Sequence, residues 1–578
     1  MSVCRSFFLG HIDYESLTPY PQMDPDEADS FEILRDSLIR FAEDHIDSRR
    51  IDAEARIPAE VLAGLAELGI FGITVPQEYD GYGASETFYA RVFETVARLD
   101  GAIVTTLGAH QSIGLKGILK YGTEDQKRRF LPPLARGEQL AAFALTEPGS
   151  GSDAASIRTR AAFDSGQDAW ILNGTKIWIT NGGLAEVFTV FAQTPVERDG
   201  AMADRITAFI VPRSLTGVSH GPEEHKLGIR GSSTTEVHFE DVAVPSELVL
   251  GEVGGGFKVA MGVLNAGRLG LAAGCVGGIK KAVAIATRHA LDREQFGRPL
   301  AEFELIQRKL ADMALEAYAA EAMVYLATGL ADRGDADLSI ESAICKVYAS
   351  EACWRAVNEA LQVAGGMGYM QEHPYERYLR DARINMIFEG TNEILRLYVG
   401  LAGLEEPGRH LKAVADALRD PVRRLGVLTD YARERALRAI ARPDLPDLHP
   451  EIAAFADPLA EYVAEFAGAV EWALRRHGKA IVERQLVLER IAEAAIDLYR
   501  MAAVISRADA ARRADDGLVG DAHVTRARLI VDRAWRGVRR NLAALRSNLD
   551  NDLRVVASEV TGSGGTVLPG QTPAPVSE

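Results

Sequence analysis

A β-rich stretch between two helical blocks constrains the fold of this chain more than any other feature. From about residue 140 to 250, short runs of β-branched and aromatic residues such as KIWIT and ITAFIVP alternate with turn residues such as Asn173-Gly174. Runs of this kind predict strands. The flanking regions repeat apolar residues every three or four positions, which predicts helices. We therefore predict an α+β, mainly α fold, with a barrel or sandwich as its middle β domain.

The chain of 578 residues is too long for one hydrophobic core, so we predict several domains. Its Gly/Pro/Ser/Thr-rich end predicts disorder, and the prolines of residues 443–450 predict a loop within the last helical block. In chain order, the predicted division is an N-terminal arm (1–26), a helical domain (27–142), a β domain (143–254), a helical bundle (255–408), an extra helical domain (409–560) and a disordered tail (561–578).

Charge and composition argue against several classes of protein. A net charge of −18 disfavours a general nucleic-acid-binding protein, because no broad basic surface would meet the phosphates. The four cysteines lack metal-ligand spacing, so we expect buried thiols and no metal site. No strand–GxGxxG–helix unit occurs, so a Rossmann dinucleotide site is not indicated. Signal, transit and membrane-spanning patterns are not recognised, which predicts a bacterial-type cytoplasmic location.

Residues 466–491 offer a membrane contact of a different kind. They combine Phe466, Val470 and Trp472 with several basic residues, and a basic amphipathic helix can lie on an anionic bilayer. The protein would then be peripheral to the inner membrane. The alternative is a helix packed against the protein core or against a second subunit.

Glu389 is the first candidate for catalysis. It stands between Phe388 and Gly390 in the segment MIFEGTNEILR. An apolar neighbour can desolvate the carboxylate, which disfavours its charged form and makes it a stronger base. The glycine permits a sharp turn and leaves room for a substrate. Read alone, an ordinary loop or helix-end carboxylate is the commoner explanation.

Two segments of the predicted β domain could bind a polar or aromatic ligand. Residues 143–153 run from a strand into a loop of small residues, where the hydroxyls of Thr146 and Ser152 could assist a phosphate or a polar ring edge. Trp178 and Thr180 stand two apart on a strand and so face the same side, which suits a flat heteroaromatic ring. A plain turn and a core tryptophan are the alternatives.

Two segments of the second helical block could each either end a helix or bind a ligand. Residues 293–298 place cations at a helix end, where they either cap the helix or bind a phosphate. Residues 362–369 place three glycines after a helix, as a C-cap or as a close backbone approach to a ligand.

Together these segments resemble the acyl-CoA dehydrogenase family. LTEPGSGSD at 145–153 and QVAGGMGYMQEHPYERYLRDA at 362–382 match its two signatures, and WITNGG, DREQFGRPL and FEGTNEILR follow in the family's order. The block at 477–508 is similar to the very-long-chain branch, which carries an extra C-terminal helical domain. The resemblance covers nearly the whole chain except about the last 18 residues.

The resemblance implies FAD-dependent α,β-dehydrogenation of long- or very-long-chain acyl-CoA to trans-2-enoyl-CoA in fatty-acid β-oxidation. Glu389 would remove the α-proton while a β-hydride passes to flavin N5, and the Glu389 backbone N–H would help to hold the thioester carbonyl oxygen. Some relatives place the base where this chain has Gly267, which cannot ionise. Electrons would leave to electron-transfer flavoprotein. An acyl-CoA oxidase and a non-catalytic assembly scaffold with the same fold are the alternatives.

The resemblance also implies two sets of contacts. Three of the cofactor contacts, in residues 293–296, would reach the FAD of a neighbouring subunit, so we expect at least a dimer. The implied FAD contacts are Phe143, Leu145, Thr146, Gly151, Ser152, Trp178, Ile179, Thr180, Arg293, Gln295, Phe296, Gln362, Gly366, Thr391, Asn392 and Glu393. The implied substrate contacts are Ser152, Asn265, Arg268, Phe388 and Gly390.

The length of the acyl chain that such an enzyme accepts depends on the depth of the acyl tunnel. A deep tunnel needs small residues at its blind end. Gly108 and Gly114 could provide that room, and ordinary tight helix packing is the alternative.

Overall fold

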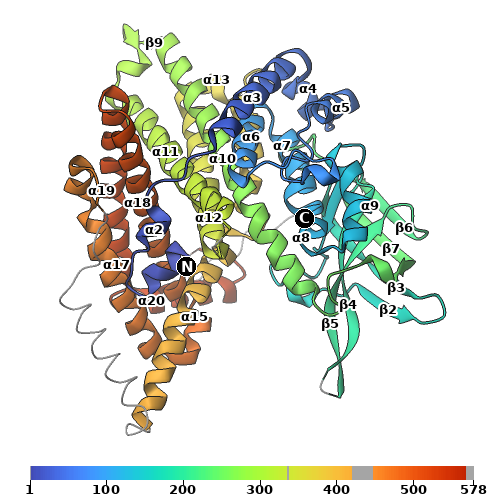
Figure 1. The fold of residues 1–578 in the computed structure, drawn as a ribbon. Helices are drawn as coiled ribbons and strands as arrows, with labels where there is room; N and C mark the ends of the chain where they lie inside the picture. The colour runs from blue at the N-terminus through green and yellow to red at the C-terminus, as the bar shows by residue number, and fades with distance from the viewer. Residues whose placement is uncertain (1, 199, 335–336, 420–446, 568–578) are drawn as a thin grey trace.

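The structure is a computed structural model that describes residues 2–198, 200–334, 337–419 and 447–567. The strands of the main sheet gather on one side of the molecule, the β9–β10 hairpin lies among the helices on the other, and the long helix α10 (Gly256–Asp292) reaches from one side to the other (Figure 1). The predicted mainly α, α+β fold with a middle β domain is confirmed.

Most helices of the N-terminal helical domain begin at an Asp, Ser or Thr whose side chain caps the first turn. The side chain of Asp24 accepts a hydrogen bond of 2.9 Å from the N–H of Asp26, and the buried Asp100 accepts two from Ala102 and Ile103. The helices are α3 (Pro25–His45), α4 (Ser48–Glu54), α5 (Ala59–Glu67), α6 (Glu86–Leu99), α7 (Gly101–Gly108), α8 (Lys116–Tyr121) and α9 (Glu124–Ala135), with a π-helical turn η2 (Ala109–Gly114) between α7 and α8.

The β domain is one sheet of eight strands in the order β6-β7-β3-β2-β4-β5-β8, with β1 paired to β4. Its register shifts between Lys176 and Ile179, so that Trp178 lies in a bulge. The strands are β1 (Ala141–Ala144), β2 (Arg160–Asp164), β3 (Ala169–Thr180), β4 (Val187–Arg198), β5 (Ala201–Pro212), β6 (Val218–Glu223), β7 (Thr234–Pro245) and β8 (Val249–Leu250).

The helical bundle that follows packs around α10. The N-terminal half of α10 lies against the sheet domain, and the later turns of α10 contact α6 and the bundle helices. The other bundle elements are β9 (Glu294–Gln295), β10 (Arg298–Pro299), α11 (Glu304–Asp332), α12 (Ser339–Ala364), α13 (Gly366–Tyr369), α14 (Tyr375–Arg383) and α15 (Asn392–Arg419).

Helix α15 runs without a break across the predicted boundary between residues 408 and 409, which stays a prediction. Pro407 and Gly408 are typical of helix ends, yet both lie inside this helix. Residues 443–446, half of the predicted loop at 443–450, lie outside the described residues, and α17 (Pro450–His477) begins at its last proline.

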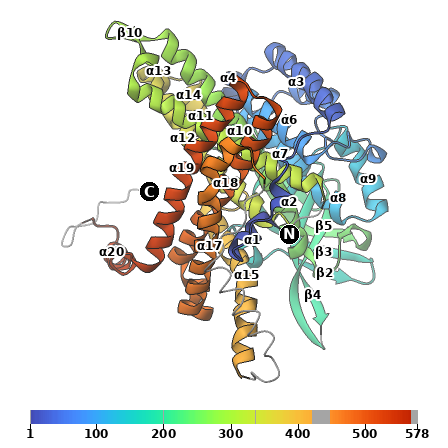
Figure 2. The same cartoon turned by 60° about the vertical axis from the view of Figure 1, so that its left-hand side comes forward.

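Beyond α15, the described residues of the extra domain form four helices, three of which pack beside the bundle (Figure 2). These are α17, α18 (Gln485–Ala514), α19 (Leu518–Arg546) and α20 (Asp550–Gly562). The N-terminal arm is part of this assembly: α1 (Val3–Phe8) is buried there, with the rings of Phe8 and Phe466 4.8 Å apart. Hydrophobic residues of both helical domains, the arm and the extra domain therefore share one continuous core.

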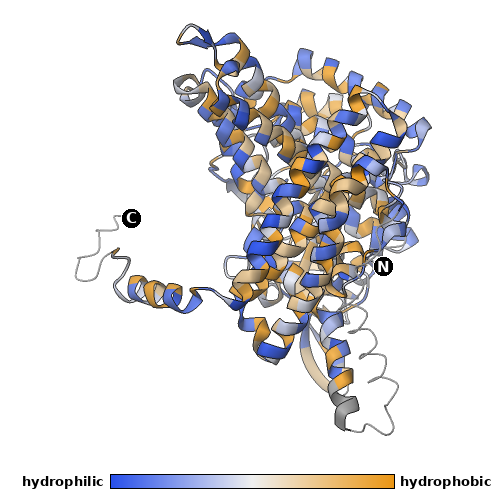
Figure 3. Ribbon diagram, turned by 90° about the vertical axis from the view of Figure 1, so that its left-hand side faces the viewer, coloured by the Kyte–Doolittle hydropathy of each residue, from blue (hydrophilic) through white to orange (hydrophobic). Residues whose placement is uncertain are grey.

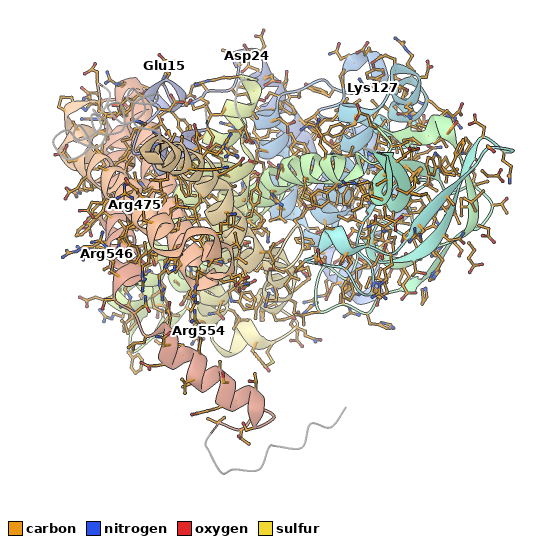
Figure 4. The ribbon with its side chains drawn as sticks, turned by 90° about the horizontal axis from the view of Figure 1, so that it is seen from below. Glu15, Asp24, Lys127, Arg475, Arg546 and Arg554 are labelled. Atoms are coloured by element: carbon orange, nitrogen blue, oxygen red, sulfur yellow. The ribbon has the colours of Figure 1, made fainter. Side chains whose placement is uncertain are left out.

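The surface of the extra domain carries many charges. Arg475 and Arg546 lie at one end of the molecule and Lys127 at the opposite end, while Arg554 lies on α20 (Figure 4). Helix α20 projects from the body (Figure 3). It extends two residues past the predicted start of the disordered tail, and residues 568–578 lie outside the described part of the chain.

The basic amphipathic segment at 466–491 turns its apolar face inward. Phe466 and Val470 are buried, which favours the packed-helix alternative over membrane contact at this face. One described helix, α10, has the length and composition of a membrane span, but 56% of its apolar window is buried inside the protein, as in a core helix. All four cysteines are free and buried, and the described residues contain no metal-binding cluster.

Candidate active site

A cavity of about 520 Å³ lies where the sheet, the N-terminal helices and α10 meet. One side follows α10 from Phe257 to Lys281, and the other is formed by the loop after β1, the end of β3, and helices α6 and α7. Glu389 and its neighbours Phe388 and Gly390 lie on its wall. The cavity thus joins residues that are far apart in the sequence.

Glu389 is held in an unusual backbone conformation. Its φ is 60° and that of Gly390 is 90°, so the chain makes a left-handed turn of two residues between α14 and α15. Such strain in a residue other than glycine is typical of functional sites. The N–H of Glu389 makes no hydrogen bond within the described part of the protein, so it can donate to a ligand.

The carboxyl group of Glu389 has the properties expected of a base. Burial raises its pKa to about 7, against the opposing effect of the positive charges on Arg268 and Lys346. Its Oε2 atom is buried and has no hydrogen-bond partner among the described residues. An orphaned oxygen on a cavity wall is available to a ligand, and a pKa near neutrality suits proton abstraction.

Gly267 faces this carboxylate from α10. A Cβ atom at residue 267 would lie 3.0 Å from the Glu389 Oε2. The two positions are thus alternative places for one carboxylate, and Glu389 is the only acid of this pair.

Sequence analysis missed Lys346, a fully buried residue on α12 that holds the Glu389 loop. Its Nζ donates hydrogen bonds of 2.8 Å to the Gly390 carbonyl and to Asn392 Oδ1. Asn392 in turn donates to Ser350 and Glu351, one turn further along α12. The only signal in the sequence was a lone lysine in the apolar run SAICKVYA, which invites the question of what it pairs with.

Arg268 supports the same loop from the other side. It is buried, its Nη1 donates to Asn265 Oδ1 at 2.7 Å, and its Nε donates to the Glu389 carbonyl at 3.4 Å. The resemblance assigned Arg268 and Asn265 to substrate contact. Both line the cavity, but in this structure they bind one another, so the Arg268 guanidinium mainly fixes and polarises the loop of the base.

The opposite wall fits a flat aromatic cofactor. Trp178 exposes 63% of its surface, although the residues on either side of it are buried, and it adopts a φ of 56° in the bulge of β3. Thr180 lines the cavity beside it, as predicted. An indole face next to a hydroxyl can stack on a heteroaromatic ring and donate to its edge.

A buried ion pair anchors the small-residue loop that adjoins this wall. Lys176 Nζ lies 2.7 Å from Glu147 Oε1, and Glu147 also accepts hydrogen bonds from the N–H groups of Arg158 and Thr159. Lys176 donates a further bond to the Leu145 carbonyl. The loop therefore keeps its shape without a ligand, which lowers the entropy cost of binding one.

The structure brings most predicted site residues together. Those lining the cavity are Phe143, Leu145, Thr146, Gly151, Ser152, Trp178, Ile179, Thr180, Asn265, Arg268, Phe388, Glu389 and Gly390. Those outside its wall are Arg293, Gln295, Phe296, Gln362, Gly366, Thr391, Asn392 and Glu393.

The residues outside the wall fall into two groups. Those at 293–296, Gln362 and Gly366 are exposed, as expected if they meet a second subunit, which stays a prediction. The buried side chain of Asn392 is committed to the hydrogen bonds that hold the loop. Cofactor contact by Thr391 and Glu393 stays a prediction.

The two glycines predicted to widen an acyl tunnel have different roles. Gly108 lines the cavity, where an added Cβ would meet only the Phe93 ring at 3.5 Å and Ser112 Oγ at 4.0 Å. At Gly114 a Cβ would lie 2.7 Å from the Ala109 carbonyl oxygen and 2.8 Å from Ala141 Cβ. Gly114 is thus required for the packing of η2 on β1, and that half of the prediction is wrong.

Comparison with known protein families agrees with this geometry. Models of the N-terminal, middle and C-terminal domains of acyl-CoA dehydrogenase match residues 28–138, 142–242 and 254–403. The very long-chain specific acyl-CoA dehydrogenase of Bos taurus is 43% identical over 98% of this chain and 89% of its own length. The chain belongs to the acyl-CoA dehydrogenase family. It is therefore an oxidoreductase that dehydrogenates acyl-CoA with FAD in fatty-acid oxidation.

Membership extends to the extra domain, since a model described as the ACAD9/ACADV C-terminal domain matches residues 450–566. Among solved structures, an acyl-CoA dehydrogenase complexed with FAD from Bacillus anthracis has a TM-score of 0.80 at 32% identity, covering 96% of this chain and 94% of that one. Butyryl-CoA dehydrogenase from Megasphaera elsdenii covers 66% of this chain and 98% of its own, with a TM-score of 0.62 and 38% identity. The difference in coverage corresponds to the arm and the extra helical domain.

Proposed function

We propose that this acyl-CoA dehydrogenase acts on long- and very-long-chain thioesters and that Glu389 removes the α-proton. The observation that carries the proposal is the buried, unpartnered Oε2 of Glu389 on the wall of a cavity that continues past it along α10. The names of the Bos taurus and Homo sapiens relatives support a very-long-chain substrate. When bound, FAD accepts the hydride from the β-carbon.

The residues around Glu389 supply two parts of the reaction. A thioester α-proton becomes acidic only if the negative charge that develops on the carbonyl oxygen is stabilised. The free N–H of Glu389 is placed to donate to that oxygen, while its carboxylate takes the proton. Arg268 and Lys346 fix the loop that carries both groups, so the base and the donor move as one unit.

The pKa of Glu389 predicts the pH dependence of the reaction. Because burial raises this pKa to about 7, the base is protonated and inactive at lower pH. We expect kcat/KM for palmitoyl-CoA to fall about tenfold per pH unit below about 7 and to level off above it. Rates measured from pH 5.5 to 8.5 test this, and a profile that is flat across pH 6 to 8 would refute the assignment of this base.

Gly108 should help to set the acyl chain length. A phenylalanine side chain there would extend from α7 into the cavity, so Gly108→Phe should lower kcat/KM for palmitoyl- and stearoyl-CoA by about tenfold or more and leave octanoyl-CoA nearly unchanged. Gly468→Phe on α17, where an added Cβ meets nothing within 4 Å, is the matched control. Unchanged turnover of the long substrates by Gly108→Phe would show that this glycine does not limit the tunnel.

The remaining expectations are proposals with their own tests. The exposed hairpin residues at 293–296 support a homodimer that shares its FAD sites, which sedimentation velocity would test. Reduction of electron-transfer flavoprotein without release of hydrogen peroxide would separate a dehydrogenase from an oxidase. A colourless protein that fails to take up FAD would favour the non-catalytic scaffold.

Cell fractionation and liposome flotation test the cytoplasmic location and a peripheral contact with the inner membrane.

A further inference from the structure

The cavity continues well beyond Glu389 along one face of α10. Gly267, Gly274, Gly278 and Lys281 are spaced to lie on one side of a helix, and all four line the cavity. A Cβ on Gly274 would lie 3.8 Å from both Ala97 Cβ and Val104 Cγ2, so this stretch is narrow and apolar. A passage with these walls accommodates an unbranched hydrocarbon chain.

The far end of this passage is positively charged. Burial and the positive charges of Arg98, Arg288 and Arg377 lower the pKa of Lys281. These four cations come from α6, α10 and α14. Within the part of the chain that the structure describes, none of the four forms an ion pair with a carboxylate. Of the four, only Lys281 lines the cavity, so its ammonium group is the one placed to bind an anion there.

The two carboxylates near this end are already engaged. Asp381 lines the cavity and accepts a hydrogen bond of 2.5 Å from the Ile229 N–H, and burial raises the pKa of Asp381 to about 7. Asp100 caps α7. The positive charge of Arg377 opposes the rise in the pKa of the buried Asp100, so Asp100 acts on Arg377, whereas the groups that lower the pKa of Lys281 are all cations.

We propose that Lys281 binds the terminal carboxylate of ω-carboxyacyl-CoA, the thioester of a long dicarboxylic acid. The helical rise of about 1.5 Å per residue puts Lys281 about 21 Å beyond Gly267, the residue that faces the base. An extended chain advances about 1.2 Å per bond, so a chain of roughly 16 to 18 carbons would span this distance. The proposal rests on the proposed function and narrows its substrate class.

Hexadecanedioyl-CoA and palmitoyl-CoA, which differ only at the far end of the chain, test the proposal with the full-length holoenzyme. Lys281→Met keeps the length of the side chain and removes its charge. We expect it to lower kcat/KM for hexadecanedioyl-CoA by about tenfold and to weaken its binding by a similar factor in calorimetry. For palmitoyl-CoA the change should stay within about twofold. Lys127→Met, which removes one charge from α9 outside the cavity wall, should change kcat/KM for neither substrate.

The outcomes separate this proposal from the function on which it rests. If palmitoyl-CoA fails to reduce the flavin of the unaltered protein, the proposed function itself is wrong. If palmitoyl-CoA reacts but Lys281→Met changes kcat/KM for hexadecanedioyl-CoA and palmitoyl-CoA by the same factor, only the ω-carboxylate site is refuted. Dodecanedioyl-CoA is too short to reach Lys281. If Lys281→Met lowered kcat/KM for dodecanedioyl-CoA as much as for hexadecanedioyl-CoA, the proposal would also be overturned.

Discussion

Replacing Lys346 by methionine should lower the rate of flavin reduction by about ten- to a hundredfold, although Lys346 does not line the cavity. The side chain of methionine has a similar length but donates no hydrogen bond, so the Gly390 carbonyl and Asn392 Oδ1 each lose their 2.8 Å partner. A buried acceptor left unpaired costs about 1–3 kcal/mol. The strained turn at Glu389 then loses one of the two cations that hold it.

The pH profile distinguishes a positioning role from a purely structural one. The positive charge of Lys346 lowers the pKa of Glu389, so its removal should move the midpoint of the kcat/KM profile upward from about 7. Lys412→Met, on the exposed side of α15, removes a charge without touching the loop and should leave the midpoint unchanged. If Lys346→Met loses activity with an unshifted midpoint, the lysine serves folding alone.

Glu389→Gln should have the largest effect on turnover, a loss of about a thousandfold or more with palmitoyl-CoA and an artificial electron acceptor. The amide keeps the shape of the side chain but cannot accept the α-proton. Circular dichroism and the flavin content of the variant control for its folding. Turnover within about threefold of the unaltered protein would exclude Glu389 as the base.

The same substitution should make the protein more stable at alkaline pH. A carboxyl whose pKa is raised in the folded state contributes its stability below the ordinary value of 4.5 and loses it as the pH rises through about 7. At pH 8 the charged Glu389 therefore costs on the order of 3 kcal/mol, which glutamine avoids. Urea unfolding of the two proteins should differ at pH 8 and converge at pH 5. Equal stability at pH 8 would mean that the buried carboxylate is better solvated than its surroundings indicate.

Local patterns in the sequence were sufficient to predict most of the architecture. Apolar repeats every three or four positions predicted the flanking helices, and β-branched runs between turn residues predicted the sheet. Phe388 and Gly390 predicted a desolvated carboxylate in a turn at Glu389, and the structure has a buried Oε2 atom and a left-handed backbone there. These features depend on residues close together in the chain, which is why they could be predicted.

Long-range pairing was not predictable in the same way. Lys346 meets the Glu389 loop 44 to 46 residues later, and nothing in either segment specifies the other. The sequence predicted residues 1–26 as a separate N-terminal arm, yet Phe8 packs on Phe466 in the extra domain. Pro407 is typical of a helix end, yet α15 stays helical through it. Such contacts depend on the assembled core, which local propensity does not encode.

The account depends on proton removal by Glu389, and rapid mixing of the oxidised holoenzyme with palmitoyl-CoA under anaerobic conditions tests it most directly. The unaltered protein should lose its flavin absorbance near neutral pH, and more slowly at pH 6. Glu389→Gln should bind palmitoyl-CoA with similar affinity in calorimetry while its flavin absorbance stays constant. Bleaching of the Glu389→Gln flavin at the rate of the unaltered protein would contradict the account.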